Sequence, residues 1–376
     1  MSRTLTFYEF FAGGGMARLG LGEGWRCLFA NDFDPLKAAT YRANFPDAQA
    51  HFHEGDVWRL TPADLPGRAD LAWASSPCQD FSLAGGRAGL AGGRSSAFFG
   101  FWRLVEGLDS EGRAPRAIVV ENVSGLLTSH DGRDFEALCA ALAGRGYRFG
   151  ALEIDAAGFL PQSRPRLFVV AVRGRATAAE GPGPYHTRGV LQAFAHLPDA
   201  LKARWIWWAP PTPPARNADL ASVLELDGAV AWHPPAKTAA LLALMAPAHM
   251  ARVEAAKARP EVSVGAVFRR MRTEDGVRVQ RAEVRFDGLS GCLRTPRGGS
   301  SRQTLVFAGG GEVRSRLLTA REAARLMGLP DSYRLPDGLH AGLHVAGDGV
   351  AVPVVRWLAR HVLEPALAAS TEPAAA

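Results

Sequence analysis

The alternation of apolar segments with segments of helical periodicity over the first 175 residues is the feature that most constrains the fold. Apolar runs typical of buried strands occur at residues 5–11, 26–31, 69–74 and 116–120. Helical spacing of apolar residues follows at 16–21, 35–44, 97–107 and 135–143. Strands that alternate with helices form parallel sheets covered on both faces. Two further apolar segments, 147–154 and 166–172, predict a closing strand pair around a polar turn. We therefore predict a doubly wound, mostly parallel α/β sheet.

The composition changes after residue 175, which indicates a domain boundary. Residues 173–262 are rich in Ala and Pro and show no strand–helix alternation. From residue 264, short strands and Arg-rich turns are expected. A helix over 319–327 is expected to begin with a capping box, because Thr319 is followed by Glu322 three residues later. We predict a first domain at 1–180, a smaller irregular domain with a hinge at 181–340, and a C-terminal helix with a disordered tail at 341–376 that returns to the first domain.

The charge distribution indicates a polyanionic partner. The chain has 43 Lys and Arg against 37 Asp and Glu, which gives a net charge of +6. The excess is concentrated in residues 264–302, a segment with nine arginines.

No apolar run approaches the roughly 20 residues that a membrane span needs, and nothing at the N-terminus resembles a leader peptide. The four cysteines are far apart and form no CxxC pair, so we expect reduced thiols, no metal site and a cytoplasmic location.

A glycine-rich turn follows the first predicted strand. Gly13, Gly14 and Gly15 allow the backbone to approach a ligand, and Asp32 stands at the end of the second strand, where an acid can bind ribose hydroxyls. Phe33 could stack on an adenine ring, and Asp56 could accept a hydrogen bond from its amino group. Glycines alone are more typical of a structural turn, but two acids at strand ends favour a nucleoside cofactor. Because the full GxGxxG pattern and a P-loop lysine are both missing, NAD and ATP are less favoured.

Reactive side chains follow three later strand ends. Cys78 comes directly after Pro77 at the carboxyl end of one strand, and Glu121 ends the next. A thiol and a carboxyl at one sheet edge suit covalent addition assisted by an acid, although an inert cysteine and a solvated acid are the alternatives. Arg164 and Arg166 are expected to point the same way before the last strand, toward an anion or a carbonyl group, unless they belong to a surface turn.

Six motifs in this order resemble those of the DNA (cytosine-5)-methyltransferase family along almost the whole chain. Each motif is weak alone, but their order and spacing are specific. They are Phe11-Ala12-Gly13-Gly14-Gly15, Pro77-Cys78-Gln79, Glu121-Asn122-Val123, Gln162-x-Arg164-x-Arg166, the run LTAREAARLMG at 318–328 and the run GDGVAVP at 347–353.

The resemblance implies a methyltransferase fold that uses S-adenosylmethionine, in which the thiolate of Cys78 adds to carbon 6 of cytosine and carbon 5 receives the methyl group. It implies that Glu121 hydrogen-bonds ring nitrogen 3, that Arg166 contacts the base carbonyl and orients Glu121, and that Arg164 supports them. A base inside a duplex must be flipped out for this reaction.

The resemblance also assigns binding residues and makes 176–290 the target-recognition region. The cofactor-binding residues that it implies are Phe11, Gly13, Gly15, Asp32, Phe33, Asp56, Val57, Asp348 and Val350. The expected DNA-binding residues are Ser82, Arg87, Gln162, Arg269, Arg272, Arg285, Arg294 and Arg297.

Two residues depart from the family pattern: Glu9 replaces the usual Asp before the glycine motif, and Asp348 replaces Asn in the last motif. Asp348 could repel the cofactor carboxylate. We expect a monomeric, nucleoid-associated bacterial protein that acts on double-stranded DNA, and a separate cognate restriction endonuclease as partner is left open. The alternatives are transfer RNA cytosine-5 methylation, an NAD-dependent oxidoreductase, and a catalytically silent DNA-binding module.

Overall fold

The computed structural model describes residues 3–76, 97–174, 176, 178–225, 228, 230–274, 276–293 and 302–369. The chain divides into two compact units. The large unit comprises Met1–Asp155, Pro165–Pro213 and Val350–Ala376, and the small unit comprises Ala156–Arg164 and Pro214–Gly349.

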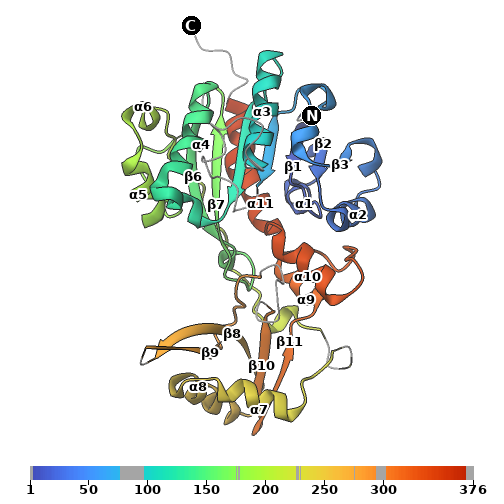
Figure 1. Cartoon of the computed structure of the whole chain (residues 1–376), viewed down its shortest axis with the longest axis vertical. Coiled ribbons are helices and arrows are strands. Elements are labelled where there is room, and N and C mark those ends of the chain that lie inside the picture. Colours follow the sequence, from blue (N-terminus) through green and yellow to red (C-terminus); the bar gives the residue numbers. More distant parts are fainter. Residues whose placement is uncertain are drawn as a thin grey trace. The chain divides into compact units, whose positions relative to one another are not determined.

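A seven-stranded sheet forms the centre of the large unit (Figure 1). Its order is β3-β2-β1-β4-β5-β7-β6, and only β7 runs antiparallel to its neighbours. The strands are β1 (Leu5–Phe10), β2 (Trp25–Asp32), β3 (Phe52–Glu54), β4 (Leu71–Ser75), β5 (Ala117–Asn122), β6 (Arg148–Asp155) and β7 (Pro165–Val172). The predicted doubly wound, mostly parallel sheet is confirmed.

The central strands are buried on both faces, which explains their uninterrupted apolar sequences. All six residues of β5 and the first four of β4 are buried. Such strands occur where helices cover both sides of a parallel sheet. The strand order reverses between β1 and β4, and the carboxyl ends of strands at such a switch point are where open α/β sheets bind ligands.

The helices of the large unit include two that come from the far end of the chain. They are α1 (Met16–Leu21), α2 (Pro35–Asn44), α3 (Ala97–Ser110), α4 (Arg133–Gly144), α5 (Arg188–His196), α6 (Asp199–Lys202), α11 (Val352–Leu358) and α12 (Glu364–Ala369). α11 packs on α1, where a Cβ on Gly20 would lie 2.4 Å from Val355 Cβ. Only glycine permits this approach, so α1 and the returning helix fit each other closely.

The small unit contains a four-stranded antiparallel sheet with helices (Figure 1). Its order is β11-β10-β8-β9, with β8 (Ser263–Glu274), β9 (Val277–Arg285), β10 (Thr304–Gly309) and β11 (Glu312–Leu317). The helices are α7 (Pro235–Ala243), α8 (Pro247–Lys257), α9 (Ala320–Leu326) and α10 (Leu339–Asp348). The Ala- and Pro-rich sequence forms α7 and α8, which both begin at a proline. The predicted capping box of Thr319 and Glu322 is present at the start of α9.

The limits of the two units differ from the predicted domain limits at 180 and 340. Residues 181–213 belong to the large unit, because residues 204–206 continue the sheet beside β6: Phe149 N donates to Arg204 O at 3.0 Å and Ile206 N donates to Phe149 O at 2.6 Å. Trp205 packs its ring on Phe149 at a centroid distance of 6.0 Å. Residues 156–164 and 341–349 belong to the small unit.

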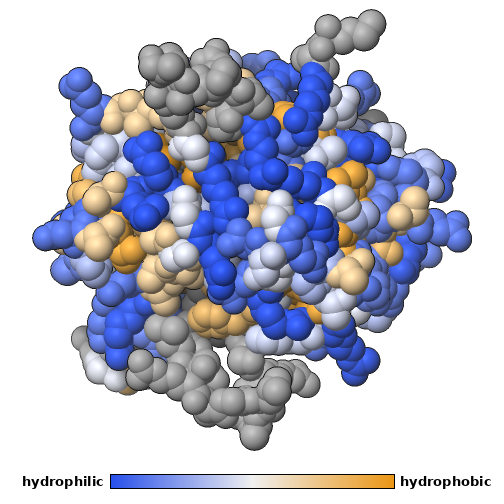
Figure 2. Space-filling view, turned by 90° about the horizontal axis from the view of Figure 1, so that it is seen from above, coloured by the Kyte–Doolittle hydropathy of each residue, from blue (hydrophilic) through white to orange (hydrophobic). Residues whose placement is uncertain are grey.

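The surface seen in Figure 2 is mainly hydrophilic, and its apolar residues form small separate patches. Within the described residues, no helix combines the length and the hydropathy that crossing a membrane requires.

Candidate functional site

Glu121 and Arg166 form an ion pair at one edge of the large unit's sheet. Glu121 lies near the end of β5, and Arg166 lies at the start of the antiparallel neighbour β7. Arg166 Nε is 3.3 Å from Glu121 Oε1, and Arg166 Nη1 donates to Pro165 O at 2.8 Å. The two side chains are 9% and 16% exposed. The guanidinium therefore orients a nearly buried carboxyl group that still reaches the surface.

The segment that carries Cys78 begins beside this pair. Ser75, the last residue of β4, is the register partner of Glu121. Asn122 Nδ2 donates to Ser76 O at 3.1 Å and to Ser76 Oγ at 3.2 Å, so β4 and β5 are tied together two residues before Cys78. Cys78, Ser82 and Arg87 themselves lie outside the described residues.

Asn122 is a site residue to which the sequence analysis gave no role. It is 4% exposed, and its Oδ1 accepts a hydrogen bond from Val123 N at 2.8 Å. The available signal in the sequence was an amide side chain directly after the predicted acid Glu121, at the end of a buried strand. A buried amide needs partners, and the neighbouring strand end is the nearest source of them.

The glycine turn after β1 is fastened to the end of β2. Phe11, Gly13 and Gly15 have positive φ angles of 57°, 55° and 80°. Gly13 N donates to Asp32 Oδ2 at 2.8 Å, and Asp34 N donates to Asp32 Oδ1 at 2.9 Å. A positive φ is rare for phenylalanine and is typical of constrained functional loops. Burial raises the pKa of Asp32.

Three residues predicted to hold a nucleoside lie near the same strand ends. Phe33, which directly follows β2, is 68% exposed although its ring is apolar. Asp56 is exposed and accepts a hydrogen bond from Trp58 N at 3.0 Å, and Val57 beside it is 4% exposed. The structure thus presents an exposed aromatic ring directly after Asp32, as stacking on a purine ring would require.

Glu9, the departure from the family pattern, is buried behind the glycine turn. Glu9 belongs to β1 and is 1% exposed. Glu9 Oε1 accepts a weak hydrogen bond from Arg18 N at 3.4 Å, and among the described residues Oε2 has no hydrogen-bond partner. Burial raises the pKa of this carboxyl to about 8. Glu9 is therefore protonated at neutral pH.

Arg164 and Arg166, which were expected to point the same way, have different partners. β7 begins at Pro165, so strand alternation does not extend back to Arg164. Arg164 belongs to the small unit, is 2% exposed, and donates to Leu293 O at 2.8 Å and Gly347 O at 2.9 Å. Its guanidinium holds backbone carbonyls in place rather than facing an open site.

Gln162 is fully buried in the small unit, which does not suit the expected DNA contact. Its Nε2 donates to Leu326 O at 2.7 Å, and its Oε1 accepts from Leu293 N at 3.0 Å. Gln162 and Arg164 thus fasten the same segment around Leu293. Both ends of the amide are used within the unit.

The last motif contains the boundary along the chain between the two units, which falls between Gly349 and Val350. Asp348 ends α10 in the small unit, and its Oδ2 lies 3.2 Å from His344 Nε2. Val350 begins the final segment of the large unit and is 4% exposed. The carboxylate that departs from the family pattern therefore has an imidazole beside it.

The expected DNA-binding arginines differ in their surroundings. Arg272 Nε donates to Glu283 at 2.7 Å and Arg285 Nε donates to Asp287 at 2.6 Å. Arg269 is exposed on β8 and forms no ion pair with any described residue. Arg294 and Arg297 lie outside the described residues.

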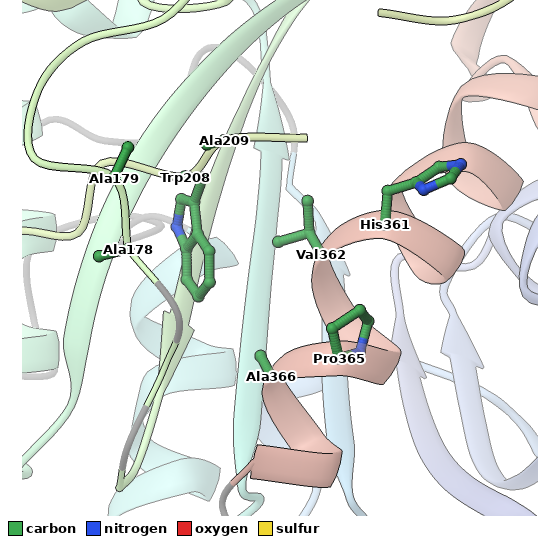
Figure 3. A pocket seen from close by; sticks show the side chains of 8 residues that line it. All are labelled: Ala178, Ala179, Trp208, Ala209, His361, Val362, Pro365 and Ala366. Carbon is green, nitrogen blue, oxygen red and sulfur yellow. The ribbon is translucent and has the colours of Figure 1, made fainter. Parts of the chain in front are cut away.

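A cavity of about 290 Å³ lies elsewhere in the large unit (Figure 3). Trp208 and Val362 face it, and most of its other lining is alanine and proline. His361 is its one titratable lining residue, and none of the predicted site residues lines it. Among the described residues, no group of three His, Cys, Asp or Glu side chains could hold a metal ion.

Residues 5–364 match the family model described as C-5 cytosine-specific DNA methylase. The chain is 26% identical to the type II methyltransferase M.HpaII of Haemophilus parainfluenzae and 24% identical to M.HhaI of Haemophilus parahaemolyticus. These matches cover 96% and 95% of this chain and 89% and 94% of the relatives. It is 34% identical to M.BsuFI of Bacillus subtilis, but that match spans 44% of this chain and 39% of the relative's length.

Two solved structures support the fold. The chain superposes on a mutant DNMT2 of Spodoptera frugiperda with a TM-score of 0.58 at 17% identity, covering 95% of this chain and 98% of that one. It superposes on the S. pombe Dnmt2 methyltransferase with a TM-score of 0.56 at 17% identity, covering 96% and 99%.

Proposed function

Because the chain belongs to the C-5 cytosine-specific DNA methylase family, we propose that it transfers the methyl group of S-adenosylmethionine to carbon 5 of a cytosine in duplex DNA. The observation that carries the proposal is the Glu121–Arg166 pair, which lies beside the strand end from which the Cys78 segment leaves. A carboxyl oriented by a guanidinium can hydrogen-bond the ring nitrogen of a base, and a thiol on the segment that follows β4 can attack that ring.

In the proposed mechanism the thiolate of Cys78 bonds to carbon 6 of a flipped-out cytosine, which makes carbon 5 nucleophilic. Glu121 hydrogen-bonds nitrogen 3 and protonates it as the sulfur adds. Arg166 keeps Glu121 in place and contacts the base carbonyl. After methyl transfer, carbon 5 loses its proton to water and the carbon–sulfur bond breaks, which restores the thiolate of Cys78. Nitrogen 3 returns its proton to Glu121.

The strand ends around the glycine turn fit an adenosyl cofactor, which supplies the electrophilic methyl group when bound. Each oxygen of Asp32 accepts one backbone N–H and keeps a further lone pair for a ribose hydroxyl. The exposed ring of Phe33 can stack on the adenine, and Asp56 and Val57 can contact its edge. The turn from Phe11 through Gly15 would face the rest of the cofactor. We assign Asp348 and Val350 to the amino-acid end of that cofactor, and Asp348 Oδ2 lies 3.2 Å from His344 Nε2.

Gln162 and Arg164 act as positioning residues in this proposal. Both are buried and bind backbone groups around Leu293, so they shape the small unit instead of touching DNA or the base. Ser82 and Arg87 remain proposed DNA contacts in the sequence after Cys78.

We propose a monomer that acts on DNA in a bacterial cytoplasm. The relatives are type II methyltransferases by name, so a separately acting restriction endonuclease is the partner to seek.

The decisive experiment is covalent trapping. A duplex with 5-fluorocytosine at the target position retains the enzyme on carbon 6, because fluorine at carbon 5 blocks the final elimination. The adduct should form with S-adenosylmethionine and be absent from Cys78→Ser. Transfer of labelled methyl groups to transfer RNA but not to duplex DNA would support the RNA alternative. Nicotinamide binding without S-adenosylmethionine binding would support the oxidoreductase, and DNA binding without an adduct would support the silent module.

A further inference from the structure

We propose that one face of the β8–β9 hairpin, formed by Arg269, Met271, Arg278 and Gln280, is the surface of this unit that contacts duplex DNA. We call it the open face. The inference rests on the proposed function and adds to it, because it separates the arginines that contact DNA from those that serve the fold.

The strand register assigns residues to the two faces of the hairpin. Residues directly opposite in an antiparallel pair share a face. Arg269 is opposite Ala282, Met271 is opposite Gln280, and Thr273 is opposite Arg278. This face begins at the pair of Val267 and Val284, which is part of the small unit's apolar core. The open face is therefore the outward continuation of the surface that packs in the core.

The opposite face is occupied by ion pairs. Arg272 donates to Glu283 at 2.7 Å, and Arg281 donates to Glu274 at 2.7 Å. Arg270 lies 3.4 Å from Glu283, and Arg285 donates to Asp287 at 2.6 Å. Four arginines thus face three carboxylates, which leaves a net charge of 4 − 3 = +1. We call this the paired face.

The open face has arginines without acids. Arg269 and Arg278 are exposed, form no ion pair with a described residue, and share their face with no Asp or Glu in either strand. The net charge of this face is therefore +2. The pKa of His233 is lowered mainly by burial and further by the charges of Lys237 and Arg269. Both cations therefore lie near His233, so Lys237 of α7 adds a positive charge on the side of Arg269.

The remaining open-face side chains suit base edges. Met271 is 48% exposed, and Gln280 lies directly opposite it. An apolar side chain such as that of Met271 can contact a thymine methyl group in the major groove. In the major groove, glutamine can form two hydrogen bonds to adenine, and arginine can form two hydrogen bonds to guanine.

The dimensions of the hairpin fit the groove. Figure 1 shows the hairpin projecting from the small unit's sheet, and its exposed part comprises about five residues of each strand. At about 3.3 Å per residue this part is roughly 16 Å long. A two-stranded ribbon fits the major groove, which is about 12 Å wide. Arginines without partners can enter it without first breaking an ion pair.

The test compares two charge-matched double variants of the full chain, Arg269→Ala/Arg278→Ala on the open face and Arg270→Ala/Arg281→Ala on the paired face. Binding to a duplex is measured by fluorescence anisotropy between 50 and about 300 mM salt. Two lost phosphate contacts reduce the slope of log affinity against log salt by roughly 1.8. We expect that reduction, with at least tenfold weaker binding, in the open-face variant only. Equal weakening of both variants, or a larger effect of the paired-face variant, overturns the inference.

Gln280→Ala tests base reading separately. Methylation of a pool of duplexes that vary around the cytosine should show relaxed discrimination at one base pair, by about tenfold; unchanged discrimination means that Gln280 contacts no base. Thermal unfolding identifies any variant that fails to fold. If the wild-type chain forms no adduct with the 5-fluorocytosine duplex, the proposed function fails. If the adduct forms and the open-face variant binds like wild type, only the inference fails.

Discussion

Arg166 Nε lies 3.3 Å from Glu121 Oε1, across two neighbouring antiparallel strands. The guanidinium comes from the second residue of β7 and the carboxyl from the fifth of β5, so the rigid sheet sets their separation. A carboxyl fixed in this way loses little conformational entropy when it binds a base, which is the advantage of a preorganised site.

Replacing Glu121 by glutamine should abolish most of the methylation while binding survives. Glutamine keeps the shape and can still hydrogen-bond, but it cannot give a proton to nitrogen 3. We expect kcat to fall by about 10²- to 10⁴-fold, with DNA affinity changed less than about threefold. Single-turnover methyl transfer measures the loss of rate, and fluorescence anisotropy measures the DNA affinity. An equal loss of binding and of turnover would argue that Glu121 only holds the structure.

Replacing Asn122 by alanine should displace the segment that begins at Ser76. The variant loses the hydrogen bonds from Nδ2 to Ser76 O and Oγ. A displacement of about 1 Å can lower a rate by about 10²-fold. The rate of adduct formation with 5-fluorocytosine DNA should fall accordingly. Asn44→Ala is the matched control, because Asn44 donates to Thr40 O at 2.9 Å on α2; its adduct should form at the wild-type rate.

The stability of the protein should depend on pH through Glu9. Its pKa is about 8 in the folded chain against 4.5 for the free side chain, because it is buried. Between pH 4.5 and 8 the unfolded chain has released this proton and the folded chain retains it. Unfolding therefore becomes easier as pH rises through this window, and the loss ends above pH 8. One pKa unit corresponds to about 1.4 kcal/mol, so the total is a few kcal/mol.

Glu9→Gln should remove this pH dependence, because an amide does not ionise. Urea unfolding at pH 5, 7 and 8.5 should show the wild type losing stability across the series relative to the variant. Arg18, Asp32, Cys27 and Tyr41 interact with Glu9. Burial raises the pKa of Cys27 to about 12, so that thiol does not titrate in this window. Parallel curves for the two proteins would show that Glu9 is ionised throughout.

The buried ion pair of the small unit should be sensitive to the loss of one partner. Arg316 and Glu322 are 1% and 0% exposed, and their side chains form two hydrogen bonds of 2.8 and 2.6 Å. Glu322→Gln leaves a buried guanidinium without its counter-charge, which costs about 3–5 kcal/mol. The midpoint of thermal unfolding should fall by several degrees. Glu283→Gln, which changes an exposed pair on the hairpin, should alter the free energy of unfolding by less than about 1 kcal/mol.

The sequence predicted the large unit well because its strands are buried on both faces. An uninterrupted run such as Ile118-Val119-Val120 has few structural alternatives, and Glu121 follows it directly at the sheet edge. The family motifs then indicated the chemistry. The placement of 181–213 beside β6 was not predictable, because the hydrogen bonds between residues 204–206 and Phe149 join segments about 55 residues apart.

The sequence by itself determined the alternation of strands and helices, the order of the motifs and the strand ends at which reactive residues stand, because all of these follow from local apolar patterning. The tertiary structure alone decided which neighbours those residues have. It paired Arg166 with Glu121, buried Arg164 among backbone carbonyls and joined Asn122 to Ser76. It also paired Arg272 with Glu283, whereas Arg269 has no ion-pair partner among the described residues. Such partners depend on strand register and on packing between distant segments, which residue patterns in a single sequence do not encode.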